Sequence, residues 1–399
     1  MPRQRVAISG LGILSAIGWT PEAVWGAIER EESGLGPLTL FESPRCGHMP
    51  VGQVKGDPAE LSGLPSGSRT DHLAVAAARI AFADTGMASL GEAARRDIGV
   101  VLGTTTGGIL DSEEFLRRLL REGRLDLGLL RHHPAASPTN AVARALGLGG
   151  FRATVSTACA SGATAIATAC DALAAGEADT VLAGGADSLS RLTVNGFCSL
   201  LNVAPDGCRP FDADRAGLSL GEGAGILVLE TEEHARARGA AVRAWIAGCG
   251  ASADAYHATA PRPDGSGALA AMRRALHVAG LQPDAVDYVN AHGTGTVDND
   301  LAEGRALAAL FGERVPAVSS TKRFFGHTLA AAGAIEAIVC VLALQRQRVP
   351  ANLGLRRPDP AIPFAPVAHA QEAELKVALT NSLGFGGNNC SLLIAREGP

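Results

Sequence analysis

The sequence feature that most constrains the fold of this chain is an internal repeat of strand-like segments. Four segments of the first half have counterparts in the second half, and both sets follow the same order. The pairs are Val6–Gly12 with Arg243–Gly250, Asp97–Thr106 with Val286–Thr296, Val155–Cys159 with Val318–Lys322, and Glu222–Glu230 with Asn388–Arg396. Four matches in one order are typical of a duplicated structural unit.

Helical stretches separate the strands of both halves. Examples are Leu73–Ala83, Ser161–Ala175 and Leu269–Ala279. Strands that alternate with helices predict an α/β fold whose largely parallel sheets are covered on both faces. A charged stretch at Ala235–Ala241 separates the repeats. We therefore expect one half to span residues 1–240 and the other to span residues 241–399.

The composition excludes several classes of protein. Hydrophobic residues make up 47% of the 399 residues and charged residues 19%, which supports a large core and excludes a disordered chain. The formal charge of −5 argues against nucleic-acid binding. The eight cysteines form no CxxC pair, so we expect no metal site and reduced thiols in the cytoplasm. Charges or glycines interrupt every long apolar window, which argues against a transmembrane helix.

Chemically reactive side chains follow several of the predicted strands. They are Cys159, His292, Lys322 and His327, together with the loop Gly384–Gly387. Ligands gather beyond the carboxyl ends of parallel strands, so these segments are expected to converge on one site. Gly10 and Gly12 are followed by Ser15 where a dinucleotide-binding motif has its third glycine, so no bound dinucleotide is expected.

Cys159 is the candidate nucleophile. It lies among small residues, after a predicted strand and just before a helical run from Ala163 to Ala175. A thiol at the start of a helix faces the positive end of the helix dipole, which lowers its pKa and favours the thiolate. The other seven cysteines are interpreted as core residues.

Two histidines can assist such a thiol. His292 and His327 each lie in a glycine-containing turn that presents the side chain to a cleft. Imidazole N–H groups stabilise an enolate or oxyanion, so a thiolate with two histidines predicts acyl chemistry. The histidines in polar or turn-like contexts are expected to be structural: His132, His133, His257 and His369.

Lys322 takes the place of Cys159 in the second half of the repeat, at an otherwise uncharged strand end. A buried ammonium group needs an anionic partner, and Glu303 or Asp300 is available downstream of His292. The loop Gly384–Gly387 can present backbone N–H groups, as an oxyanion hole requires.

Five motifs together resemble one known family over nearly the whole chain. They are Thr157–Gly162, Arg209–Asp212 with Gly221–Gly225, Asn290–Thr294, Ser320–Lys322 with Gly326–His327, and Asn381–Gly387. The chain resembles the elongating, ketosynthase II type of β-ketoacyl-(acyl carrier protein) synthase, a condensing enzyme. The resemblance implies a thiolase-like fold: two duplicated α/β halves with mixed sheets in a layered α-β-α-β-α core.

Related families fit the residues less well. Initiating synthases pair cysteine with one histidine and an asparagine, whereas this chain has two histidines. Thiolases use a second cysteine near the chain end, but Cys390 lies in a strand-like run after the glycine loop. A non-catalytic chain-length factor lacks the nucleophilic cysteine, so the presence of Cys159 argues against it.

The resemblance implies an acyltransferase reaction and a role for each catalytic residue. Cys159 is acylated, and malonyl-(acyl carrier protein) is decarboxylated and condensed with the acyl group to give a 3-oxoacyl-(acyl carrier protein), as in fatty-acid elongation. His292 and His327 assist the decarboxylation and stabilise the enolate. Lys322 holds His327 electrostatically, with Glu303 and Asp300 nearby.

It also implies roles for substrate-binding residues. The backbone N–H groups of Cys159 and Phe385 form the oxyanion hole, and Phe385 gates the pocket. Thr294 and Thr296 contact the phosphopantetheine arm, which arrives on the carrier protein, so no bound cofactor is expected.

The expected acyl pocket departs from the usual pattern. Phe197 and Thr106 occupy acyl-pocket positions, with Thr106 at the subunit interface, where fatty-acid enzymes often have a bulkier aliphatic residue. Leu383 stands where phenylalanine is usual. The smaller residues predict a pocket that accepts long or rigid unsaturated acyl chains.

The expected partners are an acyl carrier protein and a second subunit, either a copy of this chain or a different one. The segments Leu192–Phe197 and Phe324–Thr328 are similar to synthases of polyene or other specialised pathways. The alternative function is therefore a ketosynthase of a polyene or polyketide pathway that pairs with a subunit resembling a chain-length factor.

Overall fold

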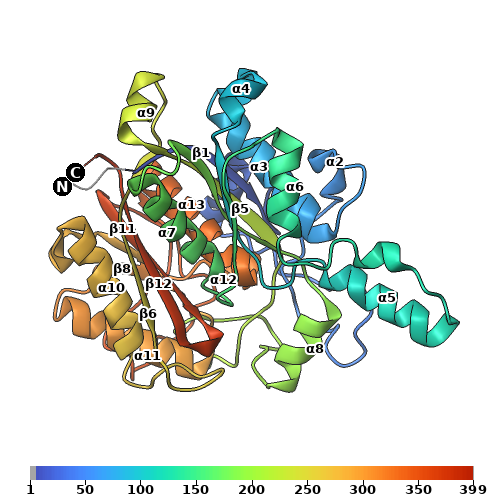
Figure 1. Ribbon diagram of the computed structural model, residues 1–399. Helices are drawn as coiled ribbons and strands as arrows, with labels where there is room; N and C mark the ends of the chain where they lie inside the picture. The colour runs from blue at the N-terminus through green and yellow to red at the C-terminus, as the bar shows by residue number, and fades with distance from the viewer. Residues whose placement is uncertain (1–5, 399) are drawn as a thin grey trace.

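A mixed β-sheet runs through the molecule (Figure 1). The computed structural model describes residues 6–398, and within them the main sheet has ten strands in the order β3-β2-β4-β5-β1-β6-β12-β11-β7-β8. The first half contributes β1 (Val6–Leu14), β2 (Gly99–Gly103), β3 (Arg152–Val155), β4 (Thr180–Asp187) and β5 (Gly223–Thr231). The second half contributes β6 (Ala244–Ala253), β7 (Tyr288–Asn290), β8 (Ala317–Ser319), β11 (Val377–Gly384) and β12 (Asn388–Ala395). A separate small ladder pairs β9 (Arg348–Val349) with β10 (Gln371–Glu372).

The strand order confirms the predicted duplication. Read outward from the centre, one half runs β1-β5-β4-β2-β3 and the other runs β6-β12-β11-β7-β8, so each strand has a counterpart at the same distance from the centre. Both halves are mixed: β2 is parallel to β3 and β4, as β7 is parallel to β8 and β11, and the inner strands are antiparallel. The halves join where Val6–Ile8 of β1 pairs with Ala244–Ile246 of β6.

The helices flank and separate the two halves of the sheet. They are α1 (Pro21–Glu29), α2 (Ala59–Ser62), α3 (Arg69–Asp84), α4 (Glu92–Arg95), α5 (Ile109–Glu122), α6 (Ser137–Leu146), α7 (Ser161–Ala174), α8 (Arg191–Ser199), α9 (Glu232–Ala237), α10 (Ser266–Ala279), α11 (Val297–Phe311), α12 (Lys322–Phe325) and α13 (Ala332–Arg346). Short 3₁₀ turns are η1 (Met87–Ser89), η2 (Leu127–Leu130), η3 (Pro283–Ala285), η4 (Leu329–Ala331) and η5 (Phe385–Gly387).

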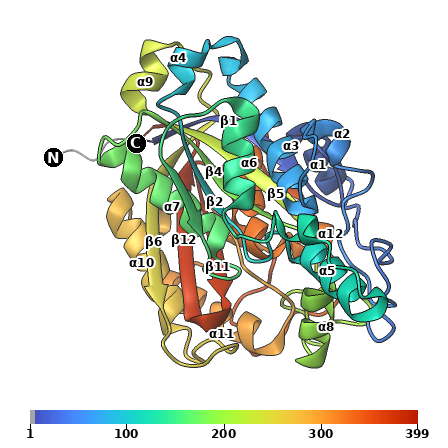
Figure 2. The ribbon, with the colours of Figure 1, turned by 45° about the vertical axis from the view of Figure 1, so that its right-hand side comes forward.

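Three hydrophobic clusters define a layered α-β-α-β-α core. The central cluster joins α7 and α13 to strands of both halves, with Ile166 and Ile338 fully buried. A second cluster packs α3 and α6 on the outer face of the first half, and a third packs α10 and α11 on the outer face of the second. Figures 1 and 2 show α3 and α6 on one side of the molecule and α10 on the other. The layers match the thiolase-like architecture that the motifs implied.

The most apolar helical segment forms the middle of this core. Leu329–Arg346 is 18 residues long with a mean hydropathy of 1.7, so by length and composition alone it could cross a membrane. It is 89% buried inside the protein, which is the environment of a core helix. The segment carries one carboxylate, that of Glu336, which is fully buried.

Two cysteines that are far apart in sequence meet in the fold. The Cα atoms of Cys46 and Cys198 are 6.5 Å apart, a separation that a disulfide can span, whereas all eight cysteines were expected to be reduced. The two residues are 152 positions apart in sequence, so no local spacing signals the contact. The fold brings them together by packing the segment after Phe41 against α8.

Candidate active site

Cys159 lies in a tight turn between β3 and α7. Ala158 adopts a left-handed backbone conformation with φ of +51°, which lets the chain reverse within a few residues. The Ser161 hydroxyl fixes this turn, because it accepts from the backbone N–H of Thr157 at 2.9 Å and donates to the carbonyl of Ala158 at 2.6 Å. The turn therefore holds the cysteine just before the first turn of α7, as the sequence predicted.

The end of β11 packs directly on this cysteine turn. A side chain at Gly384 would place its Cβ 2.7 Å from the carbonyl oxygen of Thr157 and 3.2 Å from the backbone nitrogen of Cys159, so only glycine fits. The next residue, Phe385, stacks on Phe197 of α8 with ring centroids 5.4 Å apart. The two backbone N–H groups expected to form an oxyanion hole, those of Cys159 and Phe385, therefore come from adjoining segments.

The electrostatic state of Cys159 differs from the expectation. Burial raises the pKa of the thiol to about 11, while hydrogen bonding from the Phe385 backbone and the positive charge of Lys322 act in the lowering direction. We expected the helix dipole to lower this pKa and favour the thiolate. Cys159 is only 5% exposed, and the desolvation of a charged sulfur is the largest cause of its raised pKa.

A buried carboxylate positions the turn that carries His292. Glu303 on α11 accepts the backbone N–H groups of His292 and Gly293, both at 2.8 Å, and the side-chain amide of Asn381 at 3.1 Å. Burial raises the pKa of Glu303 to about 7. These bonds use both carboxylate oxygens, so Glu303 acts as a positioning residue beneath His292.

A different segment holds His327. Its backbone N–H donates to the carbonyl of Ser219 at 2.7 Å, and its carbonyl accepts from the N–H of Gly221 at 2.9 Å. Gly326 precedes it with φ of +75°, and a Cβ there would lie 2.5 Å from the carbonyl oxygen of Leu220. The glycine predicted to relieve this turn is thus required by the close approach of the Ser219–Gly221 segment.

The two imidazole rings face each other. Their centroids are 5.2 Å apart and their planes are nearly perpendicular, at 84°. Burial and the charge of Lys322 hold the pKa of both histidines well below the usual value. His292 and His327 are therefore neutral near pH 7, and each offers one ring N–H as a hydrogen-bond donor.

Lys322 is buried as expected, but its partner is not the one expected. The ammonium pairs with Glu336 of α13, and both side chains are at most 1% exposed. Glu303 and Asp300, the expected partners, are hydrogen-bonded elsewhere: Asp300 accepts from the backbone N–H of Phe211 at 2.7 Å and of Gly295 at 3.2 Å. The geometric reason is that α13 packs behind the β8 turn and presents Glu336 to the lysine. A single carboxylate within an apolar helix was the sequence signal for this partner.

Cys159, His292, His327 and Phe385 all line one cavity of about 430 Å³. Thr294, Thr296, Phe197 and Leu383, the residues expected to bind substrate, line it as well. Further lining residues are Leu200, Leu201, Asn202, Ala216, Gly217, Leu218, Asp254, His257, Thr259, Ala260, Pro261, Val297, Asp298, Asn299, Gly384 and Asn389. His257, interpreted as structural from the sequence, thus lies on the cavity wall.

Thr106 lies outside the cavity that contains Cys159. It is not among the residues that line this cavity, and its hydroxyl donates to Asp187 at 2.8 Å. Asp187, at the end of β4, also accepts from the hydroxyl of Thr104 and from the backbone N–H of Ala330, which follows His327. Sequence reasoning missed Asp187, although a carboxylate that ends a buried strand was a usable signal. A role for Thr106 in the acyl pocket stays a prediction that depends on a second subunit.

Comparison with known proteins identifies the family. The models of the β-ketoacyl synthase N-terminal and C-terminal domains match residues 3–235 and 243–356. The chain belongs to the β-ketoacyl synthase family. It is therefore an acyltransferase of the condensing-enzyme type.

The relatives and the solved structure compared here cover nearly the whole β-ketoacyl synthase chain. It is 38% identical to Nodulation protein E of Rhizobium meliloti, with 98% of each chain covered. It is also 38% identical to 3-oxoacyl-(acyl-carrier-protein) synthase 2 of Vibrio cholerae, with 99% of this chain and 100% of the relative covered. A solved structure described as the ishigamide ketosynthase/chain length factor superposes with a TM-score of 0.95 at 36% identity, covering 99% of this chain and 100% of the other.

Proposed function

We propose that this β-ketoacyl synthase condenses an acyl thioester with malonyl-(acyl carrier protein), with loss of CO₂, to give a 3-oxoacyl-(acyl carrier protein) of fatty-acid type. The observation that carries the proposal is that one thiol and two neutral imidazoles share a cavity of about 430 Å³. A thiol can hold an acyl group, and two N–H donors can stabilise the oxygen of an enolate.

In the first half-reaction, the Cys159 sulfur attacks the carbonyl of the incoming acyl thioester. The carbon–sulfur bond to the carrier breaks, the carrier thiol leaves with a proton, and the acyl group stays on Cys159. The backbone N–H groups of Cys159 and Phe385 are the proposed donors to the oxyanion. The close packing of Gly384 on the cysteine turn supports this proposal, because it brings the end of β11 next to Cys159.

In the second half-reaction, malonyl thioester loses CO₂ and becomes an enolate. His292 and His327 are the proposed donors to the enolate oxygen, because both rings are neutral and 5.2 Å apart. The enolate carbon then attacks the acyl carbonyl, a carbon–carbon bond forms, and the Cys159 sulfur leaves. We propose that Thr294 and Thr296, whose hydroxyls lie 2.9 Å apart on the cavity wall, contact the phosphopantetheine arm.

The test separates the two half-reactions. The protein is incubated with a panel of acyl-carrier proteins, and its intact mass reports the acyl adduct. Release of CO₂ from malonyl-carrier protein is followed separately. We expect His292→Ala and His327→Ala to retain the adduct but to release CO₂ about 10²–10³-fold more slowly, the usual cost of losing an oxyanion donor.

His369→Ala is the matched control, because that side chain is 85% exposed. Parental rates of CO₂ release in both His292→Ala and His327→Ala would contradict the assignment. So would an adduct on any cysteine other than Cys159.

A second candidate function is condensation in a specialised polyene or polyketide pathway, together with a subunit resembling a chain-length factor. The observation in its favour is the likeness to the ishigamide ketosynthase/chain length factor. The adduct masses distinguish the two functions, because only the second predicts that unsaturated chains are preferred over saturated chains of the same length. A cytoplasmic location is part of the proposal for either pathway.

A further inference from the structure

The segments that carry Cys159 and His327 belong to different halves of the chain, yet they pack directly against each other. A Cβ at Gly162, in the first turn of α7, would lie 2.5 Å from the carbonyl oxygen of Ala330 in η4. A Cβ at Gly185 of β4 would lie 2.5 Å from the same oxygen. No side chain fits into this contact, so the relative position of the two segments depends on the groups around it.

One fully buried carboxylate, that of Asp187 at the end of β4, spans the contact. Its Oδ1 accepts from the backbone N–H groups of Thr105 and Thr106, at 2.9 and 2.8 Å. The same oxygen accepts from the hydroxyls of Thr104 and Thr106, both at 2.8 Å. Its Oδ2 accepts from the backbone N–H of Ala330 at 2.9 Å, and lies 3.1 Å from the nitrogen of Thr105. Asp187 therefore binds the main chain of both halves.

On the side of the first half, the three threonines lie next to the turn that carries the cysteine. The backbone N–H of Thr104 donates to the carbonyl of Val155, the last residue of β3, at 3.1 Å. The Thr105 hydroxyl lies 3.4 Å from the carbonyl oxygen of Ala158, the residue whose left-handed backbone reverses the chain. Asp187 thus supports the segment that packs on the cysteine turn.

On the side of the second half, the carboxylate binds a strained segment. Ala330 follows His327 by three residues, and Leu329 between them has a left-handed backbone with φ of +51°. A residue other than glycine keeps such a conformation only where the surrounding structure enforces it. The hydrogen bond from the Ala330 N–H to Asp187 is one of the contacts that hold this segment in place.

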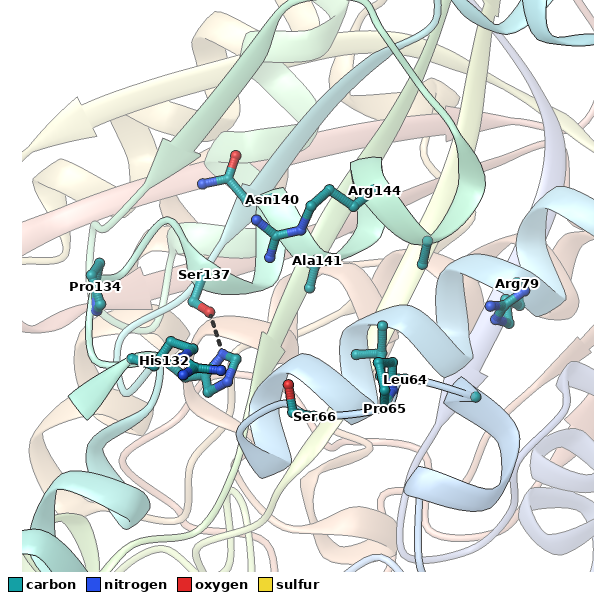
Figure 3. Close-up of a pocket in the computed structure, with 13 residues that line it drawn as sticks. Leu64, Pro65, Ser66, Arg79, His132, Pro134, Ser137, Asn140, Ala141 and Arg144 are labelled. Carbon is teal, nitrogen blue, oxygen red and sulfur yellow. Dashed lines mark hydrogen bonds between the residues drawn. The ribbon is translucent and has the colours of Figure 1, made fainter. Parts of the chain in front are cut away.

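The donors to Asp187 distinguish it from another buried carboxylate of the first half. Asp71 of α3 lies 2.8 Å from Nδ1 of His132 and accepts from the Ser137 hydroxyl at 3.0 Å. Figure 3 shows those two side chains beside a separate cavity. Within residues 6–398, Asp187 has no ion-pair partner, and its donors are three backbone N–H groups and two hydroxyls. Such bonds from the backbone to a carboxylate are strong, so they fix the path of the main chain.

We propose that Asp187 is a positioning residue that sets the placement of Cys159 relative to His327, because it binds the main chain that supports each of them. Asp187 does not line the cavity that contains Cys159, so it acts through the two turns and not on substrate. The catalytic part of the test rests on the proposed function. The reactivity of the thiol is measured without any carrier protein.

Asp187→Asn tests the proposal, because an amide cannot accept hydrogen bonds at both of its heavy atoms. Whichever way the amide lies, its NH₂ group faces an N–H donor of one half. Misplacing a reacting group by about 1 Å can cost about 10²-fold in rate. We therefore expect kcat for CO₂ release from malonyl-carrier protein to fall at least about tenfold, with KM unchanged because Asp187 does not line the cavity.

The second readout is the rate of alkylation of Cys159 by iodoacetamide between pH 8 and 10. The charge of Asp187 raises the pKa of this thiol, and the charge of Lys322 lowers it. Asp187→Asn should therefore shift the alkylation curve to lower pH. A loss of stability alone would not produce this shift.

Glu230→Gln is the matched control. Glu230 is also fully buried, but it lies opposite Thr180 at the other end of the β4–β5 pair, where it binds Arg238. Its replacement should lower stability and leave both kcat and the alkylation curve of the folded protein unchanged. Equal falls of kcat in Asp187→Asn and Glu230→Gln would overturn the proposal, as would an alkylation curve of Asp187→Asn that coincides with the parental one. Absence of CO₂ release by the parent would instead contradict the proposed function, and alkylation would still test Asp187.

Thr104→Val is a milder variant for the case that Asp187→Asn does not fold. It keeps the shape of the side chain and removes one hydroxyl donor to Asp187. We expect kcat for CO₂ release to fall several-fold with KM unchanged. A parental kcat in this variant would contradict the proposal.

Discussion

The two halves of the duplicated fold place different chemistry at the same turn. In the first half, residues 156–160 link β3 to α7 and carry the thiol of Cys159. In the second half, residues 320–331 link β8 to α13 and carry the ammonium group of Lys322. The longer second connection also supplies His327, for which the first has no counterpart. Duplication thus provided one framework, and extension of a single turn provided the additional functional group.

The helix behind each turn differs in a corresponding way. α13 carries Glu336, which neutralises Lys322 inside the core. The first turns of α7 are uncharged, with small buried residues such as Gly162, Ala163 and Ala165. One half therefore encloses an ion pair, whereas the other encloses a neutral thiol whose pKa burial raises to about 11.

The largest expected effect is on the turn of the first half. Cys159→Ser should lower condensation by at least about 10³-fold, because a serine hydroxyl there has no base arranged to deprotonate it. Intact mass after incubation with acyl-carrier protein should show no adduct. Substantial turnover by this variant would show that the nucleophile is another residue. The turn of the first half would then not carry the reactive group.

The ion pair of the second half should matter mainly for stability. Lys322→Ala should lower the free energy of unfolding by about 3–5 kcal/mol, because Glu336 is left buried without a partner. The double variant Lys322→Met/Glu336→Leu should recover most of that loss in a denaturant titration. Lys376→Ala is the control, since Lys376 is 74% exposed. A loss no larger than the control's would show that the pair is not held in the core.

The charge of Lys322 should affect the pKa of the Cys159 thiol, and therefore the pH dependence of its reactivity. Because the pKa of Cys159 is raised to about 11, the thiol is protonated at neutral pH. Its alkylation by iodoacetamide should speed up about tenfold for each pH unit from 8 to 10. In Lys322→Met/Glu336→Leu the same curve should shift to higher pH, because the lysine charge lowers this pKa. A flat profile over that range would contradict the raised pKa.

The smallest effect is expected at the His292 turn. Glu303→Gln replaces one acceptor of a backbone N–H by an amide donor, so unfolding should cost about 1–3 kcal/mol less. Decarboxylation should slow several-fold through kcat, with KM for malonyl-carrier protein unchanged, because Glu303 does not line the cavity. A change confined to KM would argue for direct contact with substrate.

Local sequence patterns predicted much of the fold because strands and helix starts are local properties. Four of the five pairs of equivalent strands in the two halves were recognised from the sequence. The fifth pair, β4 and β11, was not recognised, since β4 ends in Asp187 and β11 ends in Gly384. Glycine-containing turns marked His292 and His327, and both side chains line the cavity that contains Cys159. The predicted partner of Lys322 was wrong because Glu336 contacts the lysine through the tertiary packing of α13. The direction of the Cys159 pKa was wrong because burial depends on the whole core.

The tight approach of Gly384 to the cysteine turn has a consequence for how such an enzyme can diversify. The proposed donors to the oxyanion belong to the main chain at Cys159 and Phe385, so they persist through most substitutions of the cavity wall. Side chains such as Phe197 and Leu383 can change size without removing those donors. The arrangement separates the inherited reaction from the choice of acyl group, and descendants of one ancestor can explore new substrates with the same chemistry.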